Sequence, residues 1–167
     1  VPDRTVLCPF IGPPLKDSFM RFYGFSSADA ELAIARYRDY FAGKGLFENT
    51  VYPGIPSLLD ALENAGRRHV LATSKPGVFA ERILTHFGLR RYFSAVAGSD
   101  LDGKRVKKED VLRHALELTN AKPARSLMIG DREYDVAGAR AVGMDCIGVT
   151  YGYGSEKELS DSGAVAL

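Results

Sequence analysis

The stretch Leu127–Asp135, Leu-Met-Ile-Gly-Asp-Arg-Glu-Tyr-Asp, constrains the fold of this chain more than any other. An apolar run ends at Gly130, an aspartate follows, and a helical pattern begins near Asp135. This order of strand, glycine, aspartate and helix is typical of doubly wound α/β sheets, which build ligand sites at the carboxyl ends of their strands. Asp131 and Asp135 are four positions apart, so both carboxylates are expected on one rim, where they suit Mg²⁺. A loop aspartate beside a helix-capping aspartate is the alternative interpretation.

The residues from 52 onward alternate between strand-like and helix-like patterns. Strands are predicted at 69–72, 93–97, 126–129 and 146–149, with helices between them that end near glycines. The first strand is expected to end at the run 73–77, and a turn is predicted at 100–103. The apolar residues 163–167 look like the start of another strand. Strands that alternate with helices indicate an α/β fold with a parallel sheet and helices on both faces.

The first fifty residues differ from this pattern, because they lack β-branched runs and are rich in aromatic residues. Leu15, Phe19, Phe22 and Tyr23 share one helical face, and a second helix is predicted from Ser26 or Ser27 to Gly43; the aromatic residues are expected to pack together. The turn-forming sequence Tyr-Pro-Gly at 52–54 places a boundary there. We therefore expect a helical domain at 1–51 and an α/β domain at 52–167.

Composition limits the classes of function. A formal net charge of +1 implies no broad attraction to nucleic acid or to an anionic membrane. Cys8 and Cys146 give neither a disulfide framework nor a zinc-binding spacing, and no apolar run is long enough to cross a membrane. A cytoplasmic monomer or homodimer is expected. Because the chain starts at Val1 without an initiator methionine, a fragment of a longer protein is also expected.

Polar groups follow three of the predicted strands. Thr73 ends the first strand, Lys107 and Lys108 precede the helix after the second, and Asp131 and Asp135 follow the third. A hydroxyl, a cation and a metal-binding acidic pair on one rim are the groups that stabilise a phosphoryl group. Each has a simpler interpretation, since Thr73 can merely end a strand and the lysines can form a solvated basic loop with Lys104 and Arg105. Basic residues are unfavourable at a helix N-terminus, which favours a functional role for one lysine.

The ordered set of motifs resembles the haloacid dehalogenase superfamily. The resemblance lies in three segments of this sequence and their order. They are Leu71-Ala72-Thr73-Ser74-Lys75, Lys108 before a helix, and Gly130-Asp131 followed by Asp135. The resemblance implies that Thr73 binds the transferring phosphoryl group, that Lys108 steadies the nucleophile and the phosphate, and that Asp131 and Asp135 hold Mg²⁺. Ser74 and Lys75 would flank the phosphate pocket, and Lys107 is the weaker candidate for the lysine.

Three further segments resemble the phosphoglycolate-phosphatase branch of that superfamily, in which a helical cap follows the first core strand. They are residues 10–15, 51–54 and 152–154. The resemblance implies a Mg²⁺-dependent phosphomonoester hydrolase that acts through an aspartyl-phosphate on a small phosphorylated metabolite: phosphoglycolate, a nucleoside monophosphate or a sugar phosphate. Cap residues near Ile11–Leu15 would help to choose the substrate.

One family motif is absent from the sequence. The motif Asp-x-Asp-x-Thr, whose first aspartate is the nucleophile, does not occur, and Asp3, Asp100 and Asp102 lie in unsuitable contexts. The expected explanation is an omitted central strand, whose loss would leave a gap in the sheet. If the chain is complete, a non-catalytic phosphate-binding or regulatory module is expected instead. A nucleotidase or a phosphoglucomutase-like phosphotransferase on the same fold is the enzymatic alternative, whereas a receiver domain or a dehalogenase fits the motifs less well.

Overall fold

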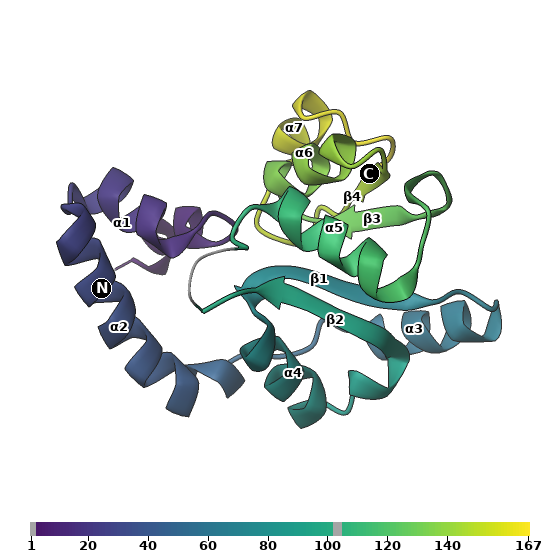
Figure 1. The fold of residues 1–167 in the computed structure, drawn as a ribbon, viewed down its shortest axis with the longest axis horizontal. Helices are drawn as coiled ribbons and strands as arrows, with labels where there is room; N and C mark the ends of the chain where they lie inside the picture. Colours follow the sequence, from purple (N-terminus) through teal and green to yellow (C-terminus); the bar gives the residue numbers. More distant parts are fainter. Residues whose placement is uncertain (1–2, 102–104) are drawn as a thin grey trace.

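The computed structural model describes residues 3–101 and 105–167 (Figure 1). The predicted turn at 100–103 and Lys104 of the predicted basic loop therefore lie partly or wholly outside the described residues, as does Asp102. Arg105, the other end of this segment, donates to the Asp100 carboxylate at 2.6 Å.

The first described part of the chain is helical, as the sequence predicts. Its elements are η1 (Arg4–Phe10), α1 (Leu15–Tyr23), α2 (Ser27–Gly43) and η2 (Gly45–Phe47). Helix α1 ends at Gly24, whose φ of 67° is left-handed, and Ser26 caps α2 by accepting a hydrogen bond from Asp29 N at 3.2 Å. We call residues 3–47 the N-terminal helical segment. The boundary between domains at residues 51 and 52 stays a prediction.

Aromatic side chains hold this segment together. The Phe10 ring lies 5.4 Å from Phe19 and 5.3 Å from Phe22, and Phe19 stacks on Phe25 at 5.9 Å. Centroid distances of this size are typical of favourable aromatic pairs. The aromatic residues contact one another as predicted, but Phe22, Tyr23 and Phe25 are 43%, 53% and 37% exposed, so these rings do not form the buried core that the sequence predicts.

The remaining elements alternate between helices and strands. They are α3 (Ile55–Asn64), β1 (His69–Pro76), α4 (Gly77–His86), η3 (Arg90–Tyr92), β2 (Phe93–Ser99), α5 (Lys108–Thr119), η4 (Pro123–Arg125), β3 (Leu127–Gly130), α6 (Glu133–Ala141), β4 (Asp145–Gly148) and α7 (Glu156–Asp161). Both strand pairs are parallel, and helices lie on both sides of them (Figure 1). The α/β fold class predicted from the sequence is confirmed.

The strands form two ladders rather than the one sheet that the sequence predicts. β1 pairs with β2 and β3 pairs with β4, and no strand of the described residues joins the two pairs. β1 is the strand of its ladder that lies nearer to β3 (Figure 1). Leu127 and Ile129 on β3 are 50% and 52% exposed, although both are apolar strand residues. The gap therefore lies between β1 and β3, where each strand has one unpaired edge.

Two sequence predictions about strand ends need correction. β1 continues beyond Ala72 to Pro76, because after an irregularity in register Pro76 still pairs with Ser99 of β2. The predicted position of Thr73 at the end of the strand is therefore wrong, because Thr73 lies inside β1. The predicted strand at 163–167 is reduced to a bridge between Ala166 and Ile147. Helix α7, which the sequence analysis does not predict, precedes this bridge.

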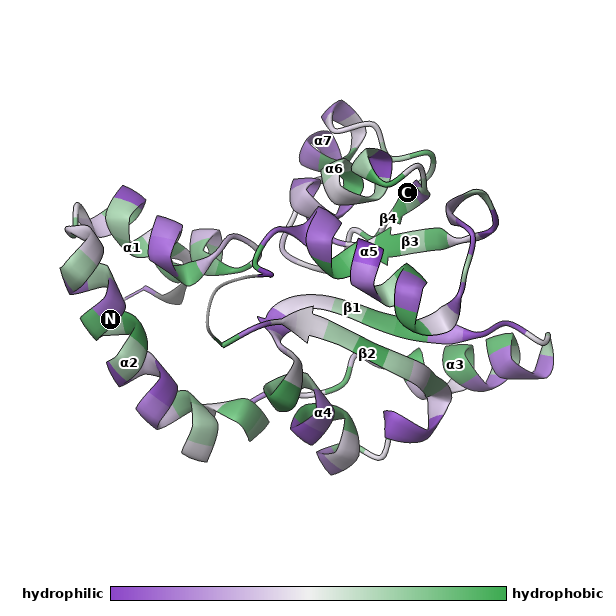
Figure 2. Cartoon of the chain, viewed as in Figure 1, coloured by the Kyte–Doolittle hydropathy of each residue, from purple (hydrophilic) through white to green (hydrophobic). Residues whose placement is uncertain are grey.

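Helix α5 connects the two ladders. Val111 and Ala115 pack with Ala97 of β2, whereas Leu112 packs with Met128 of β3. Hydrophobic residues concentrate on the strands, and the outer turns of the helices are hydrophilic (Figure 2). Burial of these apolar side chains on α5 is what fixes the two ladders relative to each other. Within the described residues, no helix has both the length and the apolar character needed to cross a membrane.

Candidate functional site

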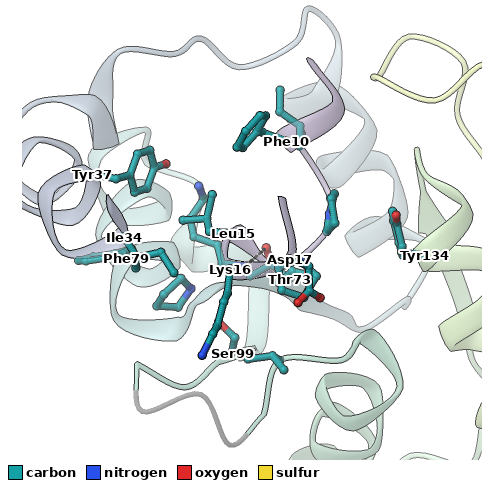
Figure 3. Close-up of a pocket in the computed structure, with 18 of the residues that line it drawn as sticks. Phe10, Leu15, Lys16, Asp17, Ile34, Tyr37, Thr73, Phe79, Ser99 and Tyr134 are labelled. Carbon is teal, nitrogen blue, oxygen red and sulfur yellow. Dashed lines mark hydrogen bonds between the residues drawn. The ribbon is translucent and has the colours of Figure 1, made fainter. Parts of the chain in front are cut away.

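A cleft of about 880 Å³ lies between the N-terminal helical segment and the carboxyl ends of the strands. Figure 3 shows Ile34 and Tyr37 of α2 on one side, Tyr134 of α6 on the other, and Thr73 of β1 between them. Every residue that the sequence analysis places in the site lines this cleft: Thr73, Ser74, Lys75, Lys108, Asp131 and Asp135. Residues 11–15, the predicted substrate-selecting segment, line it as well.

A buried ion pair forms part of the floor of the cleft. Lys108 Nζ lies 2.7 Å from Asp135 Oδ1, and only 11% and 9% of the two side chains are exposed. The same ammonium donates to the Ala72 carbonyl of β1 at 3.4 Å. An ammonium group has three N–H donors, so one is left for a ligand in the cleft.

Lys107 and Lys108 have different positions, which the sequence alone cannot decide. Lys107 is the N-cap of α5 and is exposed, whereas Lys108 is the first helical residue and turns inward. Gly138 of α6 makes this possible, because a Cβ atom there would lie 2.5 Å from Lys108 Cγ. Of the two candidate lysines, only Lys108 lines the cleft.

Asp135 also holds the loop that carries Asp131. Its Oδ2 accepts hydrogen bonds from the backbone N–H groups of Asp131 at 3.1 Å and Arg132 at 3.2 Å. With Oδ1 paired to Lys108, both oxygens of Asp135 have protein partners. The arrangement makes Asp135 an organiser of the loop at the N-terminus of α6.

Asp131 presents one oxygen to the cleft. Its Oδ2 accepts a hydrogen bond from the backbone N–H of Tyr153 at 2.8 Å. Gly152 and Gly154 flank that contact so closely that a Cβ atom at either position would collide with Asp131. In the sequence, residues 152–154 indicate only a resemblance to the phosphoglycolate-phosphatase branch. The paired glycines were the available signal of a backbone that approaches another group closely.

Thr73 and Lys75 lie two positions apart on β1. Thr73 Oγ1 accepts a hydrogen bond from the backbone N–H of Lys75 at 3.2 Å. The Lys75 ammonium lies 4.5 Å from the centre of the Phe41 ring in α2. Burial lowers the pKa of Lys75, since a desolvated ammonium is less stable in its charged form.

Arg132 is a residue that the sequence analysis missed. Its Nη1 donates to the Ile11 carbonyl, and its Nε lies 2.8 Å from Glu158 Oε1 of α7. Burial raises the pKa of Glu158. The backbone N–H of Glu133 and the Arg132 guanidinium lower the pKa by more than burial raises it, so it lies below its usual value. Arg132 thereby links the loop after β3 to the start of the N-terminal helical segment.

The donor atoms fit a divalent cation such as Mg²⁺ in part. Asp131 Oδ1 has no protein partner among the described residues. No group of three or more acidic, histidine or cysteine side chains gathers around a metal position in residues 3–101 and 105–167. Mg²⁺ commonly uses one or two carboxylates together with waters and substrate phosphates, so this donor set is sufficient only in combination with other ligands.

This chain is similar in sequence to a known protein family and to several curated proteins. A family model described as haloacid dehalogenase-like hydrolase matches residues 2–149. A 5'-nucleotidase of Pseudomonas aeruginosa is 51% identical over 158 residues, which cover 95% of this chain and 72% of that protein. A tyrosine-protein kinase of Mycobacterium tuberculosis is 42% identical and is matched by 92% of this chain. A plasmid-encoded phosphoglycolate phosphatase of Cupriavidus necator is 32% identical and is matched by 83%.

A solved structure has the same fold as this chain. The crystal structure of a predicted phosphatase from Clostridium acetobutylicum superimposes with a TM-score of 0.95 at 54% identity, covering 98% of this chain and 76% of that one. The chain spans 52% of the mycobacterial kinase and 60% of the phosphoglycolate phosphatase.

Proposed function

The chain belongs to the haloacid dehalogenase-like hydrolases, and on this premise we propose that it carries the phosphate-binding and metal-binding residues of a Mg²⁺-dependent phosphomonoesterase that acts through an aspartyl-phosphate. One observation above all supports the proposal. Lys108, Asp135 and Asp131 form a connected network on the floor of a cleft that Thr73 also lines. A cation, a hydroxyl and a free carboxylate oxygen are together the groups that stabilise a phosphoryl group during transfer.

In this proposal each side chain has a separate task. The third N–H donor of Lys108 and the Thr73 hydroxyl bind phosphoryl oxygens, and Asp135 holds Lys108 in position. Asp131, held by the N–H of Tyr153, would hold Mg²⁺ through its free oxygen. Asp135, whose two oxygens already have protein partners, would contribute only through the remaining lone pairs of those oxygens. When bound, Mg²⁺ supplies charge neutralisation at the phosphate.

The nucleophile needs a further strand. We propose that an aspartate at the end of a strand paired between β1 and β3 attacks the phosphorus, so that the aspartate–phosphorus bond forms as the ester bond breaks. The leaving alcohol takes its proton from the second aspartate of the Asp-x-Asp-x-Thr motif on that strand. Water then attacks the aspartyl-phosphate, which releases phosphate and restores the first aspartate. The unpaired edges of β1 and β3 support this position, because an added strand would pair the backbone groups of both.

The relatives bear on the substrate. The 5'-nucleotidase of Pseudomonas aeruginosa, which is 51% identical to this chain, favours a nucleoside monophosphate within the expected class of small phosphorylated metabolites. A cytoplasmic location is also proposed, since Cys8 and Cys146 are both free.

The test is hydrolysis of phosphomonoesters by protein expressed from the complete reading frame that encodes this chain. We expect phosphate release that requires Mg²⁺ and that falls at least about 10²-fold in kcat in Lys108→Met, because a preorganised donor to the reacting group is lost. Lys107→Met is the matched control, since this neighbouring lysine is exposed. Release that is independent of Mg²⁺, or equal in the two lysine variants, would refute the proposal.

The chain of 167 residues alone gives a second test. We expect it to bind inorganic phosphate and to release none from an ester, because none of its residues replaces the nucleophile. If this chain is itself active, the nucleophile lies within these 167 residues and the proposal of an added strand is wrong.

A further inference from the structure

Lys75 occupies an unusual position for a charged residue. It lies near the carboxyl end of β1 and is half-buried, with its ammonium 4.5 Å from the centre of the Phe41 ring. No carboxylate oxygen of the described residues lies within 4.0 Å of its Nζ. A cation whose partner is a ring face keeps its N–H donors available, so Lys75 can donate to a ligand in the cleft.

Three aromatic rings surround the Phe41 side of the cleft. Tyr37 stacks on Phe41 with ring centroids 5.2 Å apart and planes 16° apart, and Phe79 of α4 meets Phe41 edge-on at 5.7 Å. Burial raises the pKa of Tyr37, so its hydroxyl stays a neutral hydrogen-bond donor. Figure 3 shows Tyr37 and Phe79 on the same side of the cleft. This wall is apolar and offers ring faces, which a planar ring would contact favourably.

The wall and the cation together favour one kind of ligand. A planar ring with an acceptor oxygen on its edge would stack on the aromatic wall and accept a hydrogen bond from Lys75. A nucleobase with a carbonyl oxygen, such as the 6-oxopurine hypoxanthine, has this chemistry. Adenine carries an amino group at that position, which can only donate and so faces the Lys75 ammonium unfavourably.

We propose that Lys75, Tyr37, Phe41 and Phe79 form a subsite for the base of an oxo-nucleotide, and that Lys75 selects its carbonyl oxygen. The inference rests on the proposed function, because the phosphate of the same molecule would occupy the end of the cleft at Thr73. It assigns Lys75 to the leaving group, whereas the family resemblance implies only that Lys75 flanks the phosphate pocket.

The experiment compares the binding of inosine and adenosine 5'-monophosphates by calorimetry, with EDTA present so that no Mg²⁺-dependent turnover occurs. The protein is expressed from the complete reading frame. We expect the inosine nucleotide to bind at least about tenfold more tightly, as the loss of a charge-assisted hydrogen bond predicts. Lys75→Met is expected to bring the ratio of the two affinities close to one. Because the ratio is measured within each variant, a general loss of affinity does not affect it.

Three further variants make the result specific to Lys75. Lys75→Arg keeps a cation and is expected to retain a preference for the inosine nucleotide. Phe79→Leu removes a ring of the wall for which no cation–π contact with Lys75 is found among the described residues, and should weaken both nucleotides by a similar factor while the ratio stays. Lys122→Met, at an exposed position at the N-cap of η4, is the control and should match the wild type.

Two outcomes overturn the inference: equal affinities in the wild type, or an unchanged ratio in Lys75→Met. The wild-type comparison is decisive even if a variant does not fold. Release of phosphate from inosine 5'-monophosphate and from phosphoglycolate, assayed separately with Mg²⁺, distinguishes the two proposals. Activity without the base preference refutes the subsite alone, and the base preference without activity refutes the proposed function alone.

Discussion

Replacing Lys108 by methionine tests the ion pair at the floor of the cleft. The two charged atoms are 2.7 Å apart, and about a tenth of each side chain is exposed. The substitution would leave the Asp135 carboxylate buried with only two backbone N–H partners. Breaking a buried pair in this way costs about 3–5 kcal/mol of unfolding free energy, and the retained N–H bonds place the loss near the lower value. In a chain of this size ~3 kcal/mol lowers Tm by about 6–12 °C.

A double-mutant cycle separates the pair from other effects of the substitution. Asp135→Asn keeps an oxygen for the N–H groups of Asp131 and Arg132 but leaves Lys108 without its counter-charge. The double variant is expected to be more stable than the sum of the single losses by about 1–3 kcal/mol, because it has no unpaired buried charge. Urea unfolding followed by circular dichroism measures all three, with Lys107→Met as a control that should change stability by less than ~0.5 kcal/mol. Additive single losses would refute the reasoning.

Three more predictions concern other parts of the chain. Gly138→Ala should destabilise by about 1–3 kcal/mol in urea unfolding, because its Cβ would meet the buried lysine of α5 at 2.5 Å and the clash outweighs the gain in helix propensity. Burial raises the pKa of Cys146 to about 11, so at pH 9 iodoacetamide should alkylate half-buried Cys8 and spare Cys146, which peptide mass spectrometry can check. The free energy of unfolding that the buried thiol contributes should decline between about pH 9 and 11, because the unfolded chain loses this proton first. Ser26→Ala should cost about 1 kcal/mol by removing the N-cap of α2, whereas Ser27→Ala should be nearly neutral.

The fold could be predicted from the sequence because its signals are local. Glycines end the helices at the predicted places, as Gly24 does after α1, and apolar runs mark the strands. The length of β1 could not be predicted, since Thr73–Pro76 has turn-forming residues and stays extended only through pairing with β2. The division into two ladders depends on which strand edges meet, and no single segment encodes that information.

The positions of the site residues were predicted, but their partners were not. The choice between Lys107 and Lys108 depends on the direction of each side chain at the start of α5, which the helix fixes only once α6 packs against it. Arg132 and its contact with Ile11 join segments 121 positions apart, so no spacing pattern indicates them. Which roles these residues have in catalysis stays a prediction.

The charge balance of the floor gives Asp131 and Asp135 different roles even though their spacing looks like a matched pair of metal ligands. Lys108 neutralises Asp135, and that pair contributes no net charge to the site. The loop at Tyr153 already uses one oxygen of Asp131, so Asp131 and Asp135 together offer a cation a single carboxylate oxygen without a protein partner among the described residues. One such oxygen holds Mg²⁺ weakly, because the ion gives up its waters reluctantly and needs further anionic ligands. In this arrangement the phosphate and any carboxylate on a strand added between β1 and β3 would have to complete the metal site. Binding of Mg²⁺ would then depend on binding of the substrate, and each would strengthen the other.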